Sequence, residues 1–165
     1  MKLFTDAIEK NGFIDLRYTC DMDNSSPELR WEDVPNGTQT LALICEDPDA
    51  PRGTFVHWVV YQIPGNVRHL PAGIPPQDAL PNGIRQGLNS NRKLGYTGPC
   101  PPEGDEAHHY FFRLYALSRT LPIPARANAQ QIMECIQAEG PDVLLATAEV
   151  HGLYRRMPSE FRRAG

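Results

Sequence analysis

The chain has 165 residues, of which 41% are hydrophobic and 22% are charged, and these values are typical of an ordinary globular protein. We expect residues 1–165 to form a single domain. The formal net charge of −4 argues against a nucleic-acid partner, because binding nucleic acid requires a basic surface. No apolar run approaches the roughly 20 residues that a membrane-spanning helix needs, so we expect no stable membrane insertion.

The amino-terminal residues give no sign of export. Asp6 and Glu9 interrupt the segment with charge, so it lacks the apolar stretch of a secretory signal. We therefore expect a cytoplasmic protein, in which thiols are normally reduced. The cysteines contain neither a CxxC pair nor zinc-ligand spacing, and they are Cys20, Cys45, Cys100 and Cys135. We accordingly expect no metal and no other cofactor.

Several segments of the first half have the pattern of strands. Phe13–Cys20 is a short candidate, and Thr40–Glu46 is an apolar run between turn formers, which is typical of a buried strand. The clearest strand is Thr54–Ile63. A period of two places Phe55, His57, Val59, Tyr61 and Ile63 on one face and Val56, Trp58 and Val60 on the other. Both faces are mostly apolar, so we expect this strand inside a sheet.

The segment Pro64–Gly104 is rich in proline and glycine, and so long a connection in a compact domain is usually functional. We expect an ordered surface excursion whose last part returns to a binding site. A second central strand follows over Tyr110–Leu117, with Tyr110, Phe112, Leu114 and Ala116 on one face.

The last third contains the helical patterns. Asn128 is a candidate N-cap, and Gly140-Pro141 would stop the helix that begins there. A shorter helix is expected after Pro141 through Ala146, and a short strand over Ala148–Tyr154. The whole pattern predicts a mainly β protein, an antiparallel β-sandwich with one or two peripheral helices.

Two polar motifs lie beside the central strands. The first is Asp47-Pro48-Asp49-Ala50-Pro51, followed by His57. Its prolines hold the neighbouring backbone extended, so the loop presents carboxylates that could orient the imidazole. Taken alone, the aspartates and prolines are more typical of a turn that ends a strand, and a lone histidine on an apolar face is usually satisfied within the core.

The second motif runs from Gly98 to Gly104 and continues into His108-His109-Tyr110. Backbone N–H groups of Gly98, Cys100 and Gly104 are candidate anion donors, and His108 and Tyr110 share a strand face. Taken alone, this segment is also consistent with a simple Pro/Gly-rich turn before a strand.

The order and spacing of the two motifs resemble the signature of the phosphatidylethanolamine-binding protein family. Asn82-Gly83-x-x-Gln86-Gly87 and Gly95-Tyr96 resemble its bacterial and archaeal YbhB/YbcL-like branch. The resemblance implies a small pocket at one end of a sandwich, which in relatives accepts phosphate-like anions and head groups. Carried over by position, its residues are Asp47, Asp49, His57, Gly98, Pro101, His108 and Tyr110.

The resemblance also suggests functions and partners. The expected ligand is phosphate-like or phosphoethanolamine-like, and the expected role is binding rather than catalysis. Relatives suggest a regulator that inhibits a kinase by protein binding, or an inhibitor of a carboxypeptidase-type protease, and they suggest a homodimer. Two departures bear on these expectations: His109 stands where many members have arginine, and no counterpart of the long C-terminal helix of animal members is evident.

Enzyme hypotheses form the alternative. Asp47, Asp49, His57 and His108 could bind zinc or iron as a metal-dependent centre. A serine hydrolase is disfavoured because the chain lacks a Gly-x-Ser-x-Gly elbow, and Cys100 between prolines lacks an obvious activating group.

Overall fold

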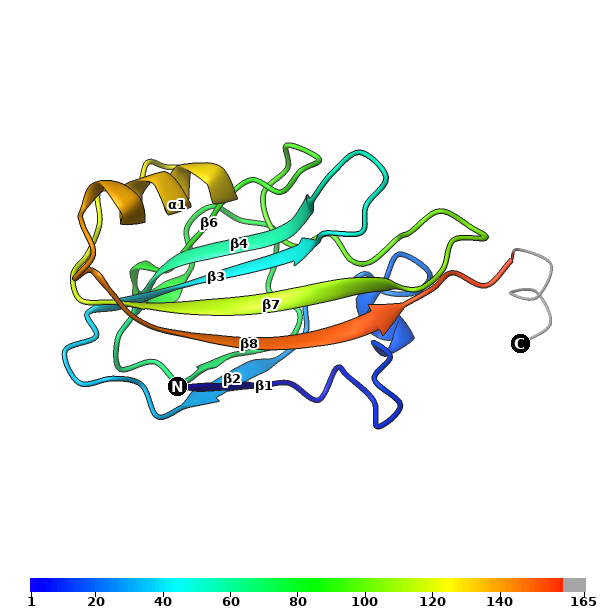
Figure 1. Cartoon of the computed structure of the whole chain (residues 1–165), viewed down its shortest axis with the longest axis horizontal. Helices are drawn as coiled ribbons and strands as arrows, with labels where there is room; N and C mark the ends of the chain where they lie inside the picture. The colour runs from blue at the N-terminus through cyan, green and yellow to red at the C-terminus, as the bar shows by residue number, and fades with distance from the viewer. Residues whose placement is uncertain (159–165) are drawn as a thin grey trace.

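The computed structural model describes residues 1–158, which form two antiparallel sheets and one α-helix (Figure 1). The larger sheet has the strand order β6-β4-β3-β7-β8 and the smaller one β1-β2-β5. The strands are β1 (Lys2–Phe4), β2 (Leu29–Glu32), β3 (Thr40–Asp47), β4 (Phe55–Pro64), β5 (His69–Leu70), β6 (Arg85–Gln86), β7 (His108–Leu117) and β8 (Leu144–Tyr154). The helix is α1 (Ala129–Ala138), and two 3-10 turns are η1 (Leu16–Tyr18) and η2 (Pro81–Gly83).

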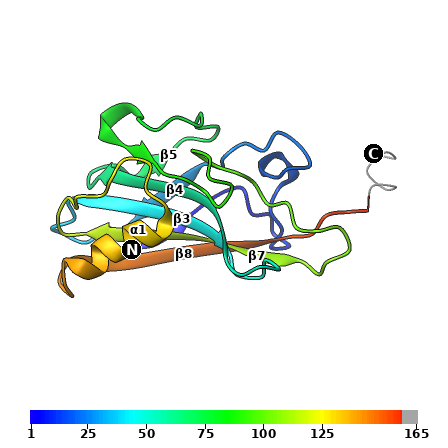
Figure 2. The same ribbon diagram turned by 90° about the horizontal axis from the view of Figure 1, so that it is seen from above.

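The main hydrophobic core lies between the two sheets. Trp31 of β2 is buried there against residues of the larger sheet such as Trp58 and Leu114. A second core fills the other face of the larger sheet, where Ile132 and Ile136 of α1 pack. Figure 2 shows α1 in front of the strands when the molecule is seen from this side. The prediction of a mainly β sandwich with a peripheral helix is therefore confirmed.

Helix α1 begins and ends where the sequence predicts. The Asn128 side chain accepts the backbone N–H of Gln131, whose side chain accepts the backbone N–H of Asn128 in return. This capping box satisfies two of the amide groups that a helix start leaves without partners. Gly140 follows the helix with φ +99°, a conformation that glycine adopts without strain. Within residues 1–158, no helix combines the length and apolar character needed to cross a membrane.

Two secondary-structure predictions are wrong. Phe13–Cys20 is not a strand, because Asp15 caps the 3-10 turn η1 by accepting the backbone N–H of Arg17. The expected helix after Pro141 is also wrong, since Leu144–Ala146 belong to β8. Ten of the eleven residues of β8 pair with β7 in an antiparallel ladder, and this long-range pairing overrides the local helical preference.

Strand β4 departs from a regular period of two. Gln62 has φ +54° at a register shift in the ladder with β3. The irregularity turns Ile63 into the core between the sheets, although the simple alternation places it with Val59 and Tyr61 on the helix side. A second register shift lies at the other end of β4.

Cys20 and Cys100 form a disulfide, so the expectation of reduced thiols is wrong for this pair. The bond joins the loop after η1 to the segment before β7, across a sequence separation of 80. Cys45 and Cys135 are free. Disulfides persist mainly in oxidising compartments or in proteins of hyperthermophiles. The cytoplasmic location stays a prediction, and this bond weakens its basis.

We expect the Cys20→Ser/Cys100→Ser variant to lose about 2–4 kcal/mol of unfolding free energy, because the bond restricts a long loop of the unfolded chain. Urea unfolding without reductant measures this difference. Cys135→Ser is the matched control, since it removes an unbonded thiol of a half-buried residue and should change stability by no more than about 0.5 kcal/mol. Equal midpoints for the double variant and the wild type would contradict the expectation.

Candidate functional site

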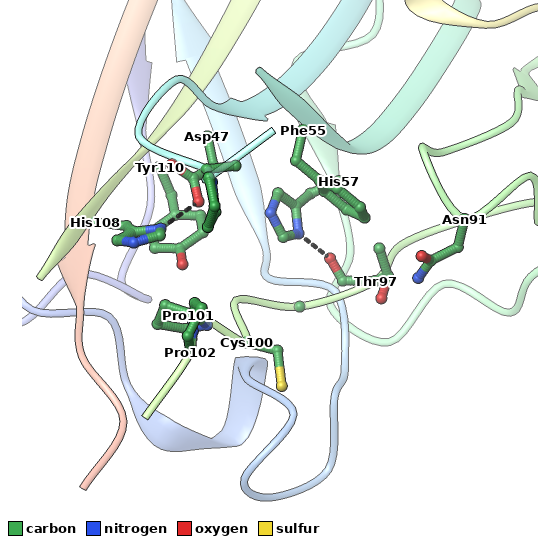
Figure 3. A pocket seen from close by; sticks show the side chains of 13 residues that line it. Asp47, Phe55, His57, Asn91, Thr97, Cys100, Pro101, Pro102, His108 and Tyr110 are labelled. Atoms are coloured by element: carbon green, nitrogen blue, oxygen red, sulfur yellow. Dashed lines mark hydrogen bonds and ion pairs between the residues drawn. The ribbon is translucent and has the colours of Figure 1, made fainter. Parts of the chain in front are cut away.

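A cavity of about 320 Å³ lies at the end of the larger sheet remote from α1. Six of the seven residues predicted from the motifs line it, and they are Asp47, His57, Gly98, Pro101, His108 and Tyr110 (Figure 3). Their presence in one cavity follows from strand direction. β3 ends at Asp47, while its antiparallel neighbours β4 and β7 begin there.

His57 owes its position to the second irregularity of β4. Cys45 of β3 pairs with Trp58, but the next residue of β3 pairs with Val56, so His57 is an inserted residue. Such a bulge re-aims a side chain and commonly occurs beside functional sites. Here it directs the imidazole into the cavity rather than along the regular pleat.

Two hydrogen bonds to the backbone of Thr97 fix the position of His57. The Thr97 N–H donates to the His57 carbonyl at 2.9 Å, and the Thr97 carbonyl accepts a hydrogen bond from His57 Nδ1 at 2.6 Å. A carbonyl only accepts, so Nδ1 carries the proton. Burial lowers the pKa of His57 to about 4, and the Thr97 hydrogen bond offsets this only partly. His57 is therefore neutral near pH 7.

His108 has the opposite character. Burial disfavours its charged form, but hydrogen bonds to Asp47 and Asp105 outweigh this effect and raise the pKa of His108. Nδ1 lies 2.7 Å from Asp47 Oδ2, and Nε2 lies 3.1 Å from Asp105 Oδ2. Because the folded pKa is above the unfolded one, charged His108 stabilises the fold below its ordinary pKa. This contribution is lost as pH rises through the folded pKa.

Tyr110 supplies a hydroxyl without a partner. The side chain is fully buried, and within residues 1–158 its hydroxyl makes no hydrogen bond. Its ring meets that of His57 edge-on, with centroids 5.2 Å apart. Burial, and next the charge of Asp47, raise the pKa of Tyr110. The hydroxyl therefore stays protonated and can donate a hydrogen bond.

Two predicted site residues behave differently from expectation. Asp49 does not line the cavity, because its carboxylate accepts hydrogen bonds from the backbone N–H and Nδ1 of His109, at 2.8 and 2.7 Å. Gly98 lines the cavity, but its N–H donates to Asn24 Oδ1 at 2.7 Å and is not directed at a ligand. A Cβ on Gly98 would lie 2.4 Å from the Tyr18 carbonyl oxygen, so the close approach requires glycine.

The metal hypothesis finds no support in this geometry. The carboxylate of Asp49 is hydrogen-bonded to His109, and both nitrogens of His108 already face carboxylates. Within residues 1–158, no group of three or more His, Cys, Asp and Glu side chains is arranged to hold a metal ion.

Sequence reasoning missed several residues of the cavity. Thr97 and Asn91 line it from the Pro/Gly-rich excursion, and Phe55 and Pro102 contribute apolar walls. Thr97 acts on His57 through its backbone, which leaves no side-chain signal in the sequence. Cys100 also lines the cavity, and its disulfide to Cys20 fixes the segment that carries Pro101. The polar side chains of Asp47, His57, His108 and Tyr110 form the cavity floor (Figure 3). Neither lysine nor arginine is among the described lining residues, so a positive charge at the floor can come only from a histidine.

Comparison with known proteins gives a consistent result. Residues 4–155 match the family described as phosphatidylethanolamine-binding protein. The chain is 44% identical to a UPF0098 protein of Methanothermobacter thermautotrophicus over 94% of this chain and 99% of the relative. A UPF0098 protein of Aquifex aeolicus is 43% identical over 94% of this chain and 89% of the relative.

Two solved structures have the same fold. Escherichia coli YbcL, described as a member of the mammalian PEBP family, superposes with a TM-score of 0.84 at 32% identity, over 94% of this chain and 98% of that one. The PEBP homologue CT736 from Chlamydia trachomatis gives a TM-score of 0.81 at 33% identity, with coverage of 94% and 97%.

We expect Asp47→Asn to lower the pKa of His108, because the substitution removes the negative charge at Nδ1 and leaves only Asp105 to oppose the effect of burial. NMR titration of the imidazole signals measures the change. Asp49→Asn is the matched control, since that carboxylate bonds His109 and should affect His108 less. An unchanged His108 pKa in Asp47→Asn would contradict the role assigned to this pair.

Proposed function

Because this chain belongs to the phosphatidylethanolamine-binding protein family, in its bacterial and archaeal YbcL-like branch, we propose that it binds a small phosphoryl-type anion and leaves it chemically unchanged. The cavity beside Asp47, His57, His108 and Tyr110 is the proposed binding site. Its volume of about 320 Å³ is near the lower end of the range for small-molecule pockets, which suits a head group or a free anion.

The observation that carries this proposal is the hydroxyl of Tyr110. A buried polar group without a partner costs about 1–3 kcal/mol. Such a group in a native fold needs an explanation, and a ligand oxygen that accepts its hydrogen bond is one. In Figure 3 the hydroxyl points toward the space between His108 and Pro101, and all three residues line the cavity.

The charge distribution supports a weakly bound, singly charged ligand. His108 faces the carboxylates of both Asp47, at 2.7 Å, and Asp105, at 3.1 Å, so these three side chains together carry no net positive charge. His57 is neutral and adds none. An anion therefore gains from the nearby imidazolium and from the Tyr110 hydrogen bond, but it does not meet the arginine clamp of a tight phosphate site.

The same features support binding without catalysis. Hydrolysis of a phosphomonoester needs very large transition-state stabilisation, which enzymes obtain with metals, arginines or a covalent nucleophile. No arginine is among the described lining residues, and Cys100 is tied to Cys20 and so is not a thiol nucleophile. General acid catalysis by a histidine contributes only about 10²–10⁴-fold.

Regulation through a protein partner stays a prediction from the family resemblance alone. This holds for inhibition of a kinase, for inhibition of a carboxypeptidase-type protease and for the expected homodimer.

We expect Tyr110→Phe to weaken phosphate binding about fivefold to tenfold while leaving the ligand-free protein as stable as the wild type or more stable. The variant loses a donor to the ligand but also removes an unpaired buried hydroxyl. Calorimetric titration and urea unfolding give the two quantities. Tyr115→Phe removes a tyrosine hydroxyl from the other face of β7, the one that carries α1, and should leave phosphate affinity unaltered. Equal phosphate affinity in wild type and Tyr110→Phe would contradict the proposed site.

Incubation with phosphoethanolamine for a day should release no inorganic phosphate above the protein-free background. A colorimetric phosphate assay measures this. His108→Ala serves as the specificity control, because phosphate release by the wild type that disappears in this variant would reinstate an enzyme at the site.

A further inference from the structure

The hydrogen-bonding direction of His57 is fixed by its backbone partner. Nδ1 donates to the Thr97 carbonyl at 2.6 Å, and a carbonyl oxygen has no proton to return. In the neutral ring the other nitrogen, Nε2, then carries a lone pair and can only accept. Figure 3 shows this second nitrogen on the side of Asp47 and Tyr110, toward the interior of the cavity. His57 therefore offers an incoming ligand an acceptor, not a donor.

The carboxylate of Asp47, like Nε2 of His57, can only accept hydrogen bonds. Its Oδ1 accepts the backbone N–H of Asp49 at 2.8 Å, and its Oδ2 lies 2.7 Å from Nδ1 of His108. Both nitrogens of His108 face carboxylates, so this ring attracts an anion by charge and not by a direct hydrogen bond. Among the side chains of Asp47, His57, His108 and Tyr110, Tyr110 offers the donor, while His57 and Asp47 offer acceptors. Thr97 and Asn91 also carry donors, and Figure 3 shows them on the far side of His57.

This arrangement of one donor and two acceptors suits a phosphoryl group that can itself both donate and accept a hydrogen bond. We propose that the cavity selects phosphoryl ligands that carry a P–OH hydrogen, namely inorganic phosphate and phosphomonoesters as monoanions, over phosphodiesters and over dianions. The inference rests on the proposed phosphoryl binding and adds the protonation state and ester class of the ligand. In the complex the P–OH group donates to His57 Nε2, and a charged P–O oxygen accepts from the hydroxyl of Tyr110.

The ligand keeps its proton in this arrangement. The pKa of His57 is lowered to about 4, whereas the second pKa of a phosphomonoester is about 6, so the shared proton stays on the oxygen. A dianion has no such proton, and its oxygens would face the lone pair of His57 and the carboxylate of Asp47. A phosphodiester is also a monoanion, but an alkyl group stands where the hydrogen is required.

Methyl phosphate and dimethyl phosphate test this selection at equal charge. Near pH 5, below the second pKa of about 6, both are mainly monoanions, and only methyl phosphate has a P–OH group. Calorimetric titration should give methyl phosphate about tenfold tighter binding, the value of one charge-assisted hydrogen bond. The ratio of the two affinities should fall as pH rises through about 6, because only methyl phosphate loses a proton there. Titration of protein groups that act on both ligands alike, such as His108, cancels in this ratio, and His57 stays mainly neutral at pH 5 and above.

Phosphorus NMR of bound methyl phosphate gives an independent measurement on the wild-type protein. If the cavity prefers the monoanion tenfold, the second pKa of the bound ligand must be raised by about one pH unit above its free value. A bound pKa equal to or below the free value would overturn the inference.

The His57→Phe variant separates hydrogen bonding from size. It removes the acceptor but keeps a planar ring, so the affinity ratio of the two esters should approach one while Tyr110 still holds the anion. A ratio that persists in this variant would assign the discrimination to steric exclusion and overturn the proposal. If the wild type binds neither ester, the proposed function itself fails. If it binds both equally, only the selection for P–OH fails.

Discussion

The antiparallel pairing of β3 with β4 and β7 is the constraint on which the site depends. β3 lies between these two strands, so its last residue stands beside their first residues, and Asp47 pairs with Phe55. The same pairing buries the residues of two cores, one against the smaller sheet and one against α1. The free energy that stabilises the sandwich therefore also holds the floor of the cavity, and the polar residues there require little further organisation.

The pKa values of the two histidines at this floor are shifted in opposite directions because their partners differ. His57 meets a backbone carbonyl and is otherwise buried, whereas His108 lies between two carboxylates. Residue type alone gives both the same intrinsic pKa, so the contrast is produced by neighbours from distant parts of the chain. The strand pairing supplies Asp47, and the Pro/Gly-rich excursion supplies Thr97. A cationic group and a neutral acceptor thus share one small volume.

Local patterns were sufficient to predict the central strands β3, β4 and β7 and helix α1, because these depend on periodicity and capping. Six of the cavity residues were predicted from the family resemblance of the two motifs. The orientation of Asp49 could not be predicted, since its partner His109 lies on another strand. The insertion of His57 is a property of register between two strands, and neither strand shows it alone. The Cys20–Cys100 bond and the extent of β8 likewise depend on contacts between segments distant in sequence.

The Cys20–Cys100 bond divides the chain into a covalent ring and two open arms. The ring contains β2, β3, β4, β5 and β6, while β1 lies on one arm and β7, α1 and β8 on the other. A pulling force applied between the two ends of the chain is transmitted through the disulfide, so the backbone between Cys20 and Cys100 is not stretched. Stretching would therefore peel β7 and β8 away from β3 while the ring resists extension. An unfoldase that grips the C-terminal arm would remove β8 and then β7, with His108 and Tyr110, before it meets the covalent ring.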